Sequence, residues 1–336
     1  MTDAVLPERD QSERGAPHPV LRVLRDRLSS GSVPGRRHDG HRLVLAIEGG
    51  GNRGAISGGM ALALYDAGLL PAFDAVYGSS AGALTGAWLL SSDPHVGIGA
   101  WADPRALLPY SRLSNLLRRR PVVDLERLVE ELYDRELKLD PQSILDNPVS
   151  FHPMATDVHT GRAVDLAPMV TDRGTLHLAL RASAALPILA GKPVALTASG
   201  YLDAGLAESV PFETPIAGGA THMLVLRSRK EGELSSDGGL SRRLTAAWLG
   251  RYGTGIREAF LARERRAAEL DLRLIRHQVD HELRPAVLSV RPAAGTPRVS
   301  RLESDPAVIA AALEAGKHAL RSALEGTVLS SGSHLG

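Results

Sequence analysis

The sequence predicts a three-layer α/β/α fold, in which a mostly parallel central sheet lies between two layers of helices. Three observations lead to this fold class. Residues 43–47 form a continuous apolar run that ends in a glycine cluster, which is typical of a parallel strand buried on both faces. A glycine loop, a helix, a second strand, a tight turn and another helix then follow, up to residue 90. Short apolar runs alternate with helical segments along the rest of the chain.

The composition is that of a globular protein with enough apolar material for a large core. Of the 336 residues, 43% are hydrophobic and 23% are charged, which excludes a disordered chain, a coiled-coil rod and a disulfide-stapled miniprotein. The 39 basic residues nearly balance the 38 acidic ones, so no nucleic-acid partner is expected. Cysteine is absent, which rules out disulfides, a thiolate nucleophile and cysteine-type metal sites.

The amino-acid composition divides the chain into three parts. Residues 1–41 are rich in Pro, Gly, Ser and charges, and we expect a flexible N-terminal arm with one short helix. Residues 42–325 form the expected folded domain, and residues 326–336 a flexible tail. The chain shows neither a secretory signal nor an apolar run of about 18 residues, the minimum for a membrane-spanning helix. We therefore expect a cytoplasmic protein whose contact with a membrane, if any, is peripheral.

Each expected element has a simple basis in the sequence. The helix at 55–67 is rich in small and apolar residues and is closed by Gly68. The short strand at 75–77 leads directly into the turn at 78–82 and an apolar helix that ends at residue 90. The later elements are a helix at 125–137, strands at 149–156 and 164–166, a helix at 176–185, a strand pair at 193–202, a strand at 223–227, a glycine-interrupted helical stretch at 240–283, a strand at 287–290 and a helix at 305–324.

The glycine string at residues 49–54 stands out from chance. In a shuffled chain of this composition, Gly-Gly-Gly-x-Arg-Gly is expected only about 0.004 times. Three of its glycines also fit a dinucleotide-binding pattern, but that use requires an acidic residue at the end of the second strand. Residues 77–80, Tyr-Gly-Ser-Ser, stand there instead. The nucleotide reading is therefore disfavoured, and the backbone N–H groups of Gly50 and Gly51 are candidate donors to an oxyanion.

Residues 78–82, Gly-Ser-Ser-Ala-Gly, have the pattern of a nucleophile elbow. A side chain exposed on a strand-to-helix turn needs strained backbone angles, and the residues two before and two after it must lack bulk. Gly78 and Gly82 meet this requirement around Ser80. Ser80 would also lie at a helix N-terminus, where the dipole favours negative charge. We therefore expect Ser80 to be a nucleophile in acyl transfer.

The proton acceptor for Ser80 has two possible arrangements in the sequence. Asp203 follows a strand-like segment, so its carboxylate can emerge at the same sheet edge and take the Ser80 proton directly. In the chain order of a Ser, Asp, His triad, Asp203 would act through a later histidine. The candidates for that histidine are His222, His277 and His281.

Three segments together resemble the signatures of the patatin-like phospholipase family: residues 47–54, 78–82 and 203–205. Softer similarities at residues 155–161 and 181–187 extend the resemblance over residues 42–325, and the Glu before the glycines is similar to a bacterial branch of the family. The resemblance implies a Ser80–Asp203 dyad without histidine and an oxyanion hole from Gly49, Gly50 and Gly51. It further implies hydrolysis of lipid acyl esters through an acyl-enzyme, without metal or organic cofactor. The implied partner is a lipid ester, with transient membrane-surface contact.

One position departs from the family pattern. The family has Asp-Gly-Gly or Asp-Gly-Ala at its third signature, whereas Ala204 follows Asp203 here. If that position needs a positive φ, alanine costs about 1 kcal/mol and could tilt the Asp203 carboxylate. Two alternatives therefore stay open beside a lipid hydrolase. One is a carboxylesterase for small esters with the same dyad, and the other is a catalytically impaired patatin-like protein that binds lipid or acyl groups.

Three further features have two readings each. Arg53 is a candidate substrate-binding cation for a phosphate or carboxylate, or a brace of the glycine loop with Glu48 as its partner. The helical stretch at 240–283 has two interpretations: it packs on the sheet, or it forms a flap that covers the substrate or faces a membrane. The arginine run at 118–120 is expected to be a solvated face, or to meet an anionic lipid surface.

Overall fold

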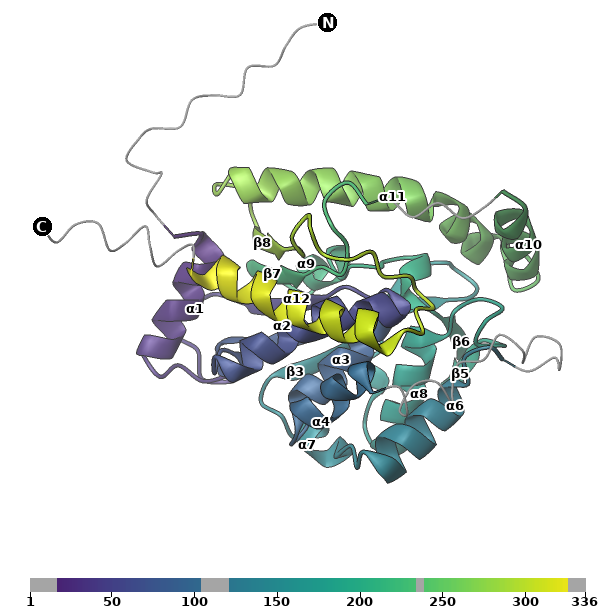
Figure 1. The fold of residues 1–336 in the computed structure, drawn as a ribbon, viewed down its shortest axis with the longest axis horizontal. Coiled ribbons are helices and arrows are strands. Elements are labelled where there is room, and N and C mark those ends of the chain that lie inside the picture. The colour runs from purple at the N-terminus through teal and green to yellow at the C-terminus, as the bar shows by residue number, and fades with distance from the viewer. Residues whose placement is uncertain (1–16, 104–120, 234–238, 326–336) are drawn as a thin grey trace, which may run out of the picture.

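The computed structural model describes residues 17–103, 121–233 and 239–325. Over these residues the chain has the expected three-layer α/β/α fold (Figure 1). The strands are β1 Leu43–Ile47, β2 Ala75–Ser79, β3 Ser150–Asp157, β4 Ala163–Asp165, β5 Val194–Leu196, β6 Ser199–Leu202, β7 His222–Leu226 and β8 Ala286–Val290. Within the described ranges they form one eight-stranded sheet in the order β5-β6-β3-β2-β1-β7-β8, with β4 paired to β3.

The middle of the sheet is parallel and its β3 side is antiparallel. Strands β3, β2, β1, β7 and β8 run in one direction, whereas β4, β5 and β6 run against their neighbours. The carboxyl ends of the parallel strands therefore meet at one edge, which is where sites form in such sheets.

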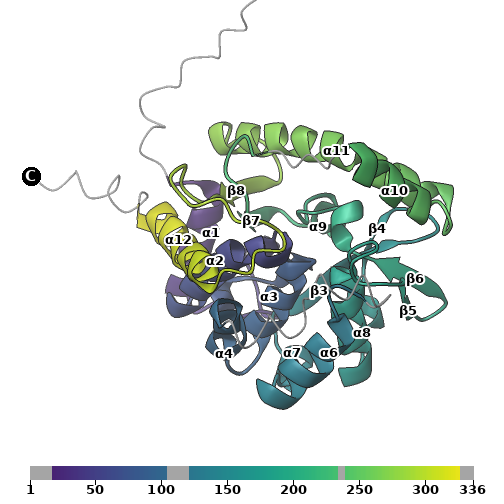
Figure 2. The same cartoon turned by 45° about the vertical axis from the view of Figure 1, so that its right-hand side comes forward.

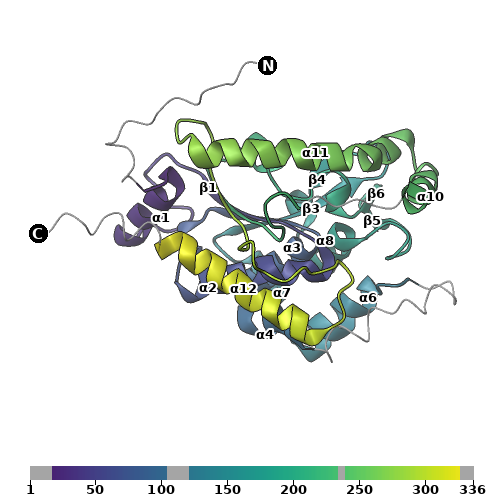
Figure 3. The same cartoon turned by 45° about the horizontal axis from the view of Figure 1, so that its top comes forward.

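Helices cover both faces of the sheet. The longer ones are α1 Pro19–Ser29, α2 Ala55–Asp66, α3 Ala81–Leu90, α8 Arg173–Ala184, α10 Gly239–Leu249, α11 Thr254–Val279 and α12 Pro306–Glu325. The short ones are α4 Pro94–Gly99, α6 Leu125–Arg127, α7 Pro141–Leu145 and α9 Glu213–Ala217. Figures 2 and 3 show α11 on one side of the sheet, and α2, α3 and α12 on the other.

Alternation along the strands explains why both faces need cover. In β1, Leu43, Leu45 and Ile47 belong to the core cluster that includes residues of α2, α3 and α12. Val44 and Ala46 belong to the opposite cluster, which includes residues of α11. Successive side chains of a strand point to opposite faces, so a strand that is apolar at every position requires two helical layers.

Most expected elements are present, and the differences are local. The helix expected at 125–137 begins as α6 and continues in wider, π-helical turns over Leu128–Glu136. The stretch at 240–283 is split into α10 and α11, with Gly253 in an extended, glycine-favoured conformation between them. Helices α4 and α7 were not expected, because they are too short for a hydrophobic period, although each begins with an Asp cap followed by Pro.

The expectation of a flexible arm does not hold for residues 17–41. Helix α1 buries Val20, Leu21, Val23 and Leu24 in the main core. Arg27 is only 1% exposed and donates hydrogen bonds to the carboxylates of Asp39 and Asp74. The folded domain therefore begins before residue 42, because α1 packs an apolar face on the core and its buried guanidinium pairs with Asp39 and Asp74. Residues 1–16, the tail at 326–336 and the arginine run at 118–120 lie outside the described residues.

A search of the described helices finds none with the length and apolar character needed to cross a lipid bilayer.

Replacing Arg27 with Met is expected to lower the free energy of unfolding by about 2 kcal/mol, because the buried guanidinium no longer donates hydrogen bonds to the partly exposed carboxylates of Asp39 and Asp74. Urea unfolding measures this change. Arg22, exposed on the same helix, supplies the matched control, and Arg22→Met should change stability by less than about 0.5 kcal/mol. Equal stabilities for the two variants would contradict the role assigned to the Arg27 ion pair.

Candidate active site

Ser80 lies on a strained turn between β2 and α3. Its backbone angles are φ 55° and ψ −124°, a region that non-glycine residues adopt at a cost of about 1–3 kcal/mol. The flanking glycines make the turn possible. A Cβ at Gly78 would meet Ala83, and one at Gly82 would collide with the carbonyl of Ile47. The turn thus packs against the end of β1 with no room for larger side chains.

Two hydrogen bonds hold Ser80 in this conformation. Its backbone N–H donates to Ser183 Oγ at 3.0 Å, and its hydroxyl donates to Asp203 Oδ2 at 2.6 Å. Ser80 is 6% exposed and Asp203 is 4% exposed. The structure therefore brings together the two residues singled out in the sequence, in a largely dehydrated environment.

Asp203 is held by its backbone as well as by its carboxylate. It follows β6, where its N–H donates to the carbonyl of Ala185 and its carbonyl accepts from Thr156 Oγ1 at 2.9 Å. The second carboxylate oxygen, Oδ1, accepts from the N–H of Gly205 at 2.8 Å. One oxygen is thus fixed by the backbone, while the other faces the Ser80 hydroxyl.

Burial raises the pKa of Asp203 above its ordinary value. The hydrogen bonds from Ser80 and Gly205, and the charge of Arg301, act in the opposite direction without cancelling the effect. A carboxylate with a raised pKa is a stronger base than an ordinary aspartate, so this environment suits proton abstraction from a hydroxyl.

The backbone conformation of Ala204 shows that alanine is not strained by a positive φ at this position. Ala204 begins a short 3₁₀ helix, Ala204–Leu206, and is not among the residues with positive φ. Its methyl group is buried in the core cluster on the α11 side of the sheet. Alanine therefore introduces no backbone strain at this position, and the carboxylate of Asp203 remains in contact with Ser80.

The glycine loop after β1 lies beside the Ser80 turn. The N–H of Gly49 donates to the carbonyl of Ser209 at 3.3 Å, and the carbonyl of Gly49 accepts from Ser228 Oγ at 2.7 Å. Within the described residues, the N–H groups of Gly50 and Gly51 donate no hydrogen bond to the protein. Gly50 and Gly51 therefore carry the available donors of the loop, whereas the N–H of Gly49 is engaged.

A buried ion pair fixes the base of this loop. Glu48 is 2% exposed, and its Oε2 accepts from Arg227 Nε at 2.9 Å and from the N–H of Ser228 at 2.8 Å. Burial disfavours the ionised carboxylate, but the surrounding guanidinium groups outweigh this cost and lower the pKa of Glu48 to about 2. The groups responsible are, in decreasing order, those of Arg227, Arg229 and Arg53.

Glu48 is not the direct partner expected for Arg53. Its hydrogen bond and ion pair go to Arg227, and a second ion pair joins it to Arg229 Nε at 3.5 Å. Arg53 instead donates from Nε to the hydroxyl of Ser228 at 3.3 Å. Arg53 thus lies against the glycine loop through Ser228, while it also lines the cavity described next.

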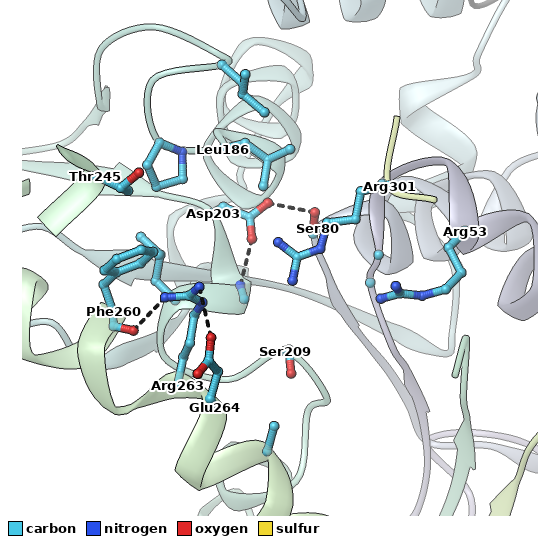
Figure 4. Close-up of a pocket in the computed structure, with 18 of the residues that line it drawn as sticks. Arg53, Ser80, Leu186, Asp203, Ser209, Thr245, Phe260, Arg263, Glu264 and Arg301 are labelled. Atoms are coloured by element: carbon cyan, nitrogen blue, oxygen red, sulfur yellow. Dashed lines mark hydrogen bonds and ion pairs between the residues drawn. The ribbon is translucent and has the colours of Figure 1, made fainter. Parts of the chain in front are cut away.

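Ser80 and Asp203 open into a cavity of about 300 Å³. Figure 4 shows the Ser80–Asp203 hydrogen bond between Arg53 and Arg301 on one side and Leu186, Phe260 and Thr245 on the other. The far wall comes from α10 and the first half of α11, so the stretch at 240–283 both packs on the domain and lines the cavity. The residues it contributes are Ser241, Thr245, Phe260, Arg263, Glu264 and Ala267.

The three histidines considered as triad members lie away from the cavity. His222 is level with Leu43 at the first residue of its strand, whereas Ser80 follows the carboxyl end of β2. His277 stacks edge-on with Phe212, and His281 with His18. None of the three lines the cavity, so the direct Ser80–Asp203 contact is the arrangement that the geometry supports.

Several residues at the site were missed as site residues in the sequence. Ser183 and Thr156 hydrogen-bond the backbones of Ser80 and Asp203. Their segments were expected as a helix and a strand with a soft family resemblance, not as parts of the site. Arg229 and Arg301 also line the cavity. The only sequence signal for Arg229 is its place just after a buried strand, and no local signal identifies Arg301.

The fold and the site together define an α/β protein that presents a serine on a nucleophile elbow against a buried aspartate. A sequence model described as "Patatin-like phospholipase" matches residues 45–216, just over half of the chain. The chain belongs to the patatin-like phospholipase family, and this membership implies lipid acyl hydrolase activity.

Comparison with other proteins adds little beyond the family. A search of curated protein sequences gives no match. Among solved structures, the chain is similar to the crystal structure of VipD from Legionella pneumophila, with 13% sequence identity and a TM-score of 0.36. That match covers 85% of this chain and 67% of the other.

Glu48 is expected to make stability depend on pH in the acid range. Its pKa is about 2 in the folded protein against an ordinary value of 4.5, so its contribution is complete above about pH 4.5 and is lost as the pH falls toward 2. The difference corresponds to about 3 kcal/mol. Urea unfolding of wild type and Glu48→Gln at several pH values should show their stabilities converging on acidification. Parallel pH profiles would contradict this assignment.

Proposed function

We propose that this protein is a serine acyl-ester hydrolase that acts on lipids, in the manner of a phospholipase A, through a Ser80–Asp203 dyad. The observation that carries the proposal is the 2.6 Å hydrogen bond from the hydroxyl of Ser80, whose backbone is strained, to the buried carboxylate of Asp203, both of which line one cavity. Membership of the patatin-like phospholipase family supports the same chemistry.

The first half of the reaction forms an acyl-enzyme. Asp203 accepts the hydroxyl proton as Ser80 Oγ attacks the ester carbonyl carbon, which gives a tetrahedral oxyanion. The oxyanion collapses, the bond from carbon to the leaving oxygen breaks, and Asp203 returns the proton to the departing alcohol. Serine then carries the acyl group as an ester.

Water completes the cycle by the same route. Asp203 takes a proton from the water molecule as its oxygen attacks the acyl carbonyl, and Ser80 leaves as the alcohol when the proton is returned. The products are a carboxylic acid and the free enzyme. The raised pKa of Asp203 supports both its basic and its acidic role, because it lies closer to neutrality than that of an ordinary aspartate.

The oxyanion needs donors that are already in position. The N–H groups of Gly50 and Gly51 are without protein acceptors in the described structure, and Ser80 lies at the N-terminus of α3, whose dipole favours negative charge. Removing one such donor from an acyl-transfer site typically costs about a hundredfold or more in kcat.

The two alternatives differ in measurable ways. A carboxylesterase with the same dyad would prefer short acyl chains, so a series of glycerol esters of increasing chain length separates it from a lipid hydrolase. A non-catalytic binder was suggested by Ala204, but the relaxed conformation of that residue removes the reason for it.

Labelling by a fluorescent fluorophosphonate tests for an activated serine. Wild type is expected to label, whereas Ser80→Ala and Asp203→Asn should lose labelling and ester turnover by at least about a thousandfold. Circular dichroism of the variants controls for folding. A folded wild type that fails to label would overturn the hydrolase proposal, and full labelling of Ser80→Ala would place the nucleophile elsewhere.

The pH dependence of kcat/KM tests the role of Asp203. Only the ionised carboxylate accepts a proton, so activity should fall about tenfold per pH unit below the pKa of Asp203. Burial raises that pKa, so the acidic limb should lie above the ordinary range of about 4 for aspartate. The rate of fluorophosphonate labelling should follow the same limb. If the residual activity of Asp203→Asn still falls with pH along the same acidic limb, the general base is a group other than Asp203.

A further inference from the structure

Five of the twelve histidines come together at the amino edge of the parallel strands, opposite to the cavity. They belong to the start of α1, the segment before β1, the first position of β7, the end of α11 and the turn after it, and we call them the histidine cluster: His18, His41, His222, His277 and His281. Figures 1 and 3 show α1 and the C-terminal end of α11 at the same end of the molecule.

The rings of the histidine cluster lie against one another. The ring centroids of His18 and His281 are 4.7 Å apart, and those of His41 and His222 are 4.5 Å apart, both edge-to-face. His222 and His277 are also close enough for their charges to act on His18. A proton on one ring therefore makes a proton on the next less favourable.

The buried members of the cluster have no acidic partner. His18, His222 and His277 are each 8% exposed. None of the three forms an ion pair with a carboxylate of the described residues, whereas His95, elsewhere in the chain, pairs with Asp66. A proton on one of these buried rings thus adds a positive charge that no carboxylate neutralises.

The other charged groups around the cluster add to this repulsion. Besides burial, the groups that act on His222 are, in decreasing order, those of His41, Arg284, Arg27 and Asp39. Those that act on His277 are Arg273 and, more weakly, Asp280. At both positions the cations outweigh the carboxylate.

The buried rings are neutral in the folded protein at pH 7. Burial is the largest cause that lowers the pKa of His18 and of His222 from 6.5 to about 4, and the neighbouring histidines lower it further. Burial also lowers the pKa of His277. The docked cluster therefore resists protonation well below the pH at which an exposed histidine becomes charged.

The hydrogen bond that starts α1 requires a neutral His18. Its Nδ1 accepts from the N–H of Val20 at 3.2 Å and so caps the first turn of the helix. A protonated imidazole donates from both ring nitrogens and accepts at neither. Protonation of His18 thus removes the cap and also places a charge beside the ring of His281.

Helix α1 is positioned to respond to this charge. It contacts β1, β7 and β8, so repulsion within the cluster acts across the surface on which the helix is docked. No strand precedes α1 in the described part of the chain, so the helix can leave without breaking any strand pairing. Its departure exposes the apolar residues Val20, Leu21, Val23 and Leu24.

We propose that the histidine cluster is a pH-sensitive switch that holds α1 on the sheet at neutral pH and releases it in mildly acidic solution. Release returns the ring of His18 to water, where its ordinary pKa is 6.5, so the released state binds protons more readily than the docked state. Docking is therefore strongest above about pH 6.5 and weakens as the pH falls toward 4. At pH 5, His18 alone shifts the balance toward release by about thirtyfold.

Hydrogen exchange of the full-length protein at pH 7.5 and pH 5 tests the switch. After correction for intrinsic exchange rates, the protection of amides in residues 19–29 should fall about thirtyfold or more at pH 5, while that of residues 43–47 in β1 falls less than about threefold. His18→Asn keeps a capping oxygen but cannot titrate, and it should reduce the loss in α1 by about tenfold or more. Adding His222→Phe should remove most of the remainder.

Two controls separate the switch from other effects of acid. His159→Gln, at an exposed histidine outside the cluster, should behave like wild type. Ser80→Ala should also show the wild-type response, because the cluster lies at the opposite edge of the sheet from the cavity. Unchanged protection of α1 at pH 5, or the same loss in His18→Asn as in wild type, would overturn the proposal. Parallel losses in α1 and β1 would indicate general acid unfolding and would overturn it as well.

Titration of the histidine rings by NMR decides the question in wild type alone. The rings of His18 and His222 should remain neutral at pH 6 and become protonated together with the loss of protection in α1. If both rings titrate near pH 6.5 while α1 stays protected at pH 5, the cluster does not control docking and the proposal fails.

Discussion

The site depends on the ion pair and hydrogen bonds made by the buried carboxylate of Glu48. This carboxylate joins the end of β1 to the segment after β7 through Arg227 and the N–H of Ser228. Ser228 then holds the carbonyl of Gly49, so the glycine loop is fixed at the carboxyl edge of the sheet. A charge this deeply buried is tolerated only because several guanidinium groups surround it. Two of these groups, those of Arg53 and Arg229, belong to residues that also line the cavity.

The strain at Ser80 is sustained by contacts that come from distant parts of the chain. The turn packs against the end of β1, Ser183 of α8 binds its N–H, and Asp203 after β6 accepts its hydroxyl proton in a hydrogen bond. Each contact crosses between different elements of the sheet or its helical cover. A strained conformation that costs a few kcal/mol persists only when its surroundings determine it in this way. The fold itself thus holds the hydroxyl of Ser80 against the carboxylate of Asp203.

The sequence pattern predicted the structure correctly wherever a single short segment specifies the local backbone conformation. The apolar run at 43–47, the glycine string and the elbow at 78–82 each specify a local backbone shape, and the structure contains all three. The pattern was misleading at the N-terminus, where composition indicated a flexible arm. Helix α1, the short helix expected there, is fixed to the domain by its buried apolar face and by the pairing of Arg27 with Asp39 and Asp74. The pairing of Arg27 with Asp74, 47 residues away, leaves no periodic pattern in the sequence.

The sequence by itself determined the fold class and the position of the elbow, because these follow from spacing within a few residues. The residues left both a direct Asp203 partner and a histidine triad open for Ser80, and only the family resemblance implied the direct pair. Only the tertiary structure decided that Ala204 is unstrained, that Glu48 pairs with Arg227, and that Arg229 and Arg301 line the same cavity as Ser80. Arg301 is 221 positions from Ser80 in the chain, so no window of sequence contains both. Their proximity depends on how the parallel strands and the α12 segment meet at one edge of the sheet, and that is a property of packing.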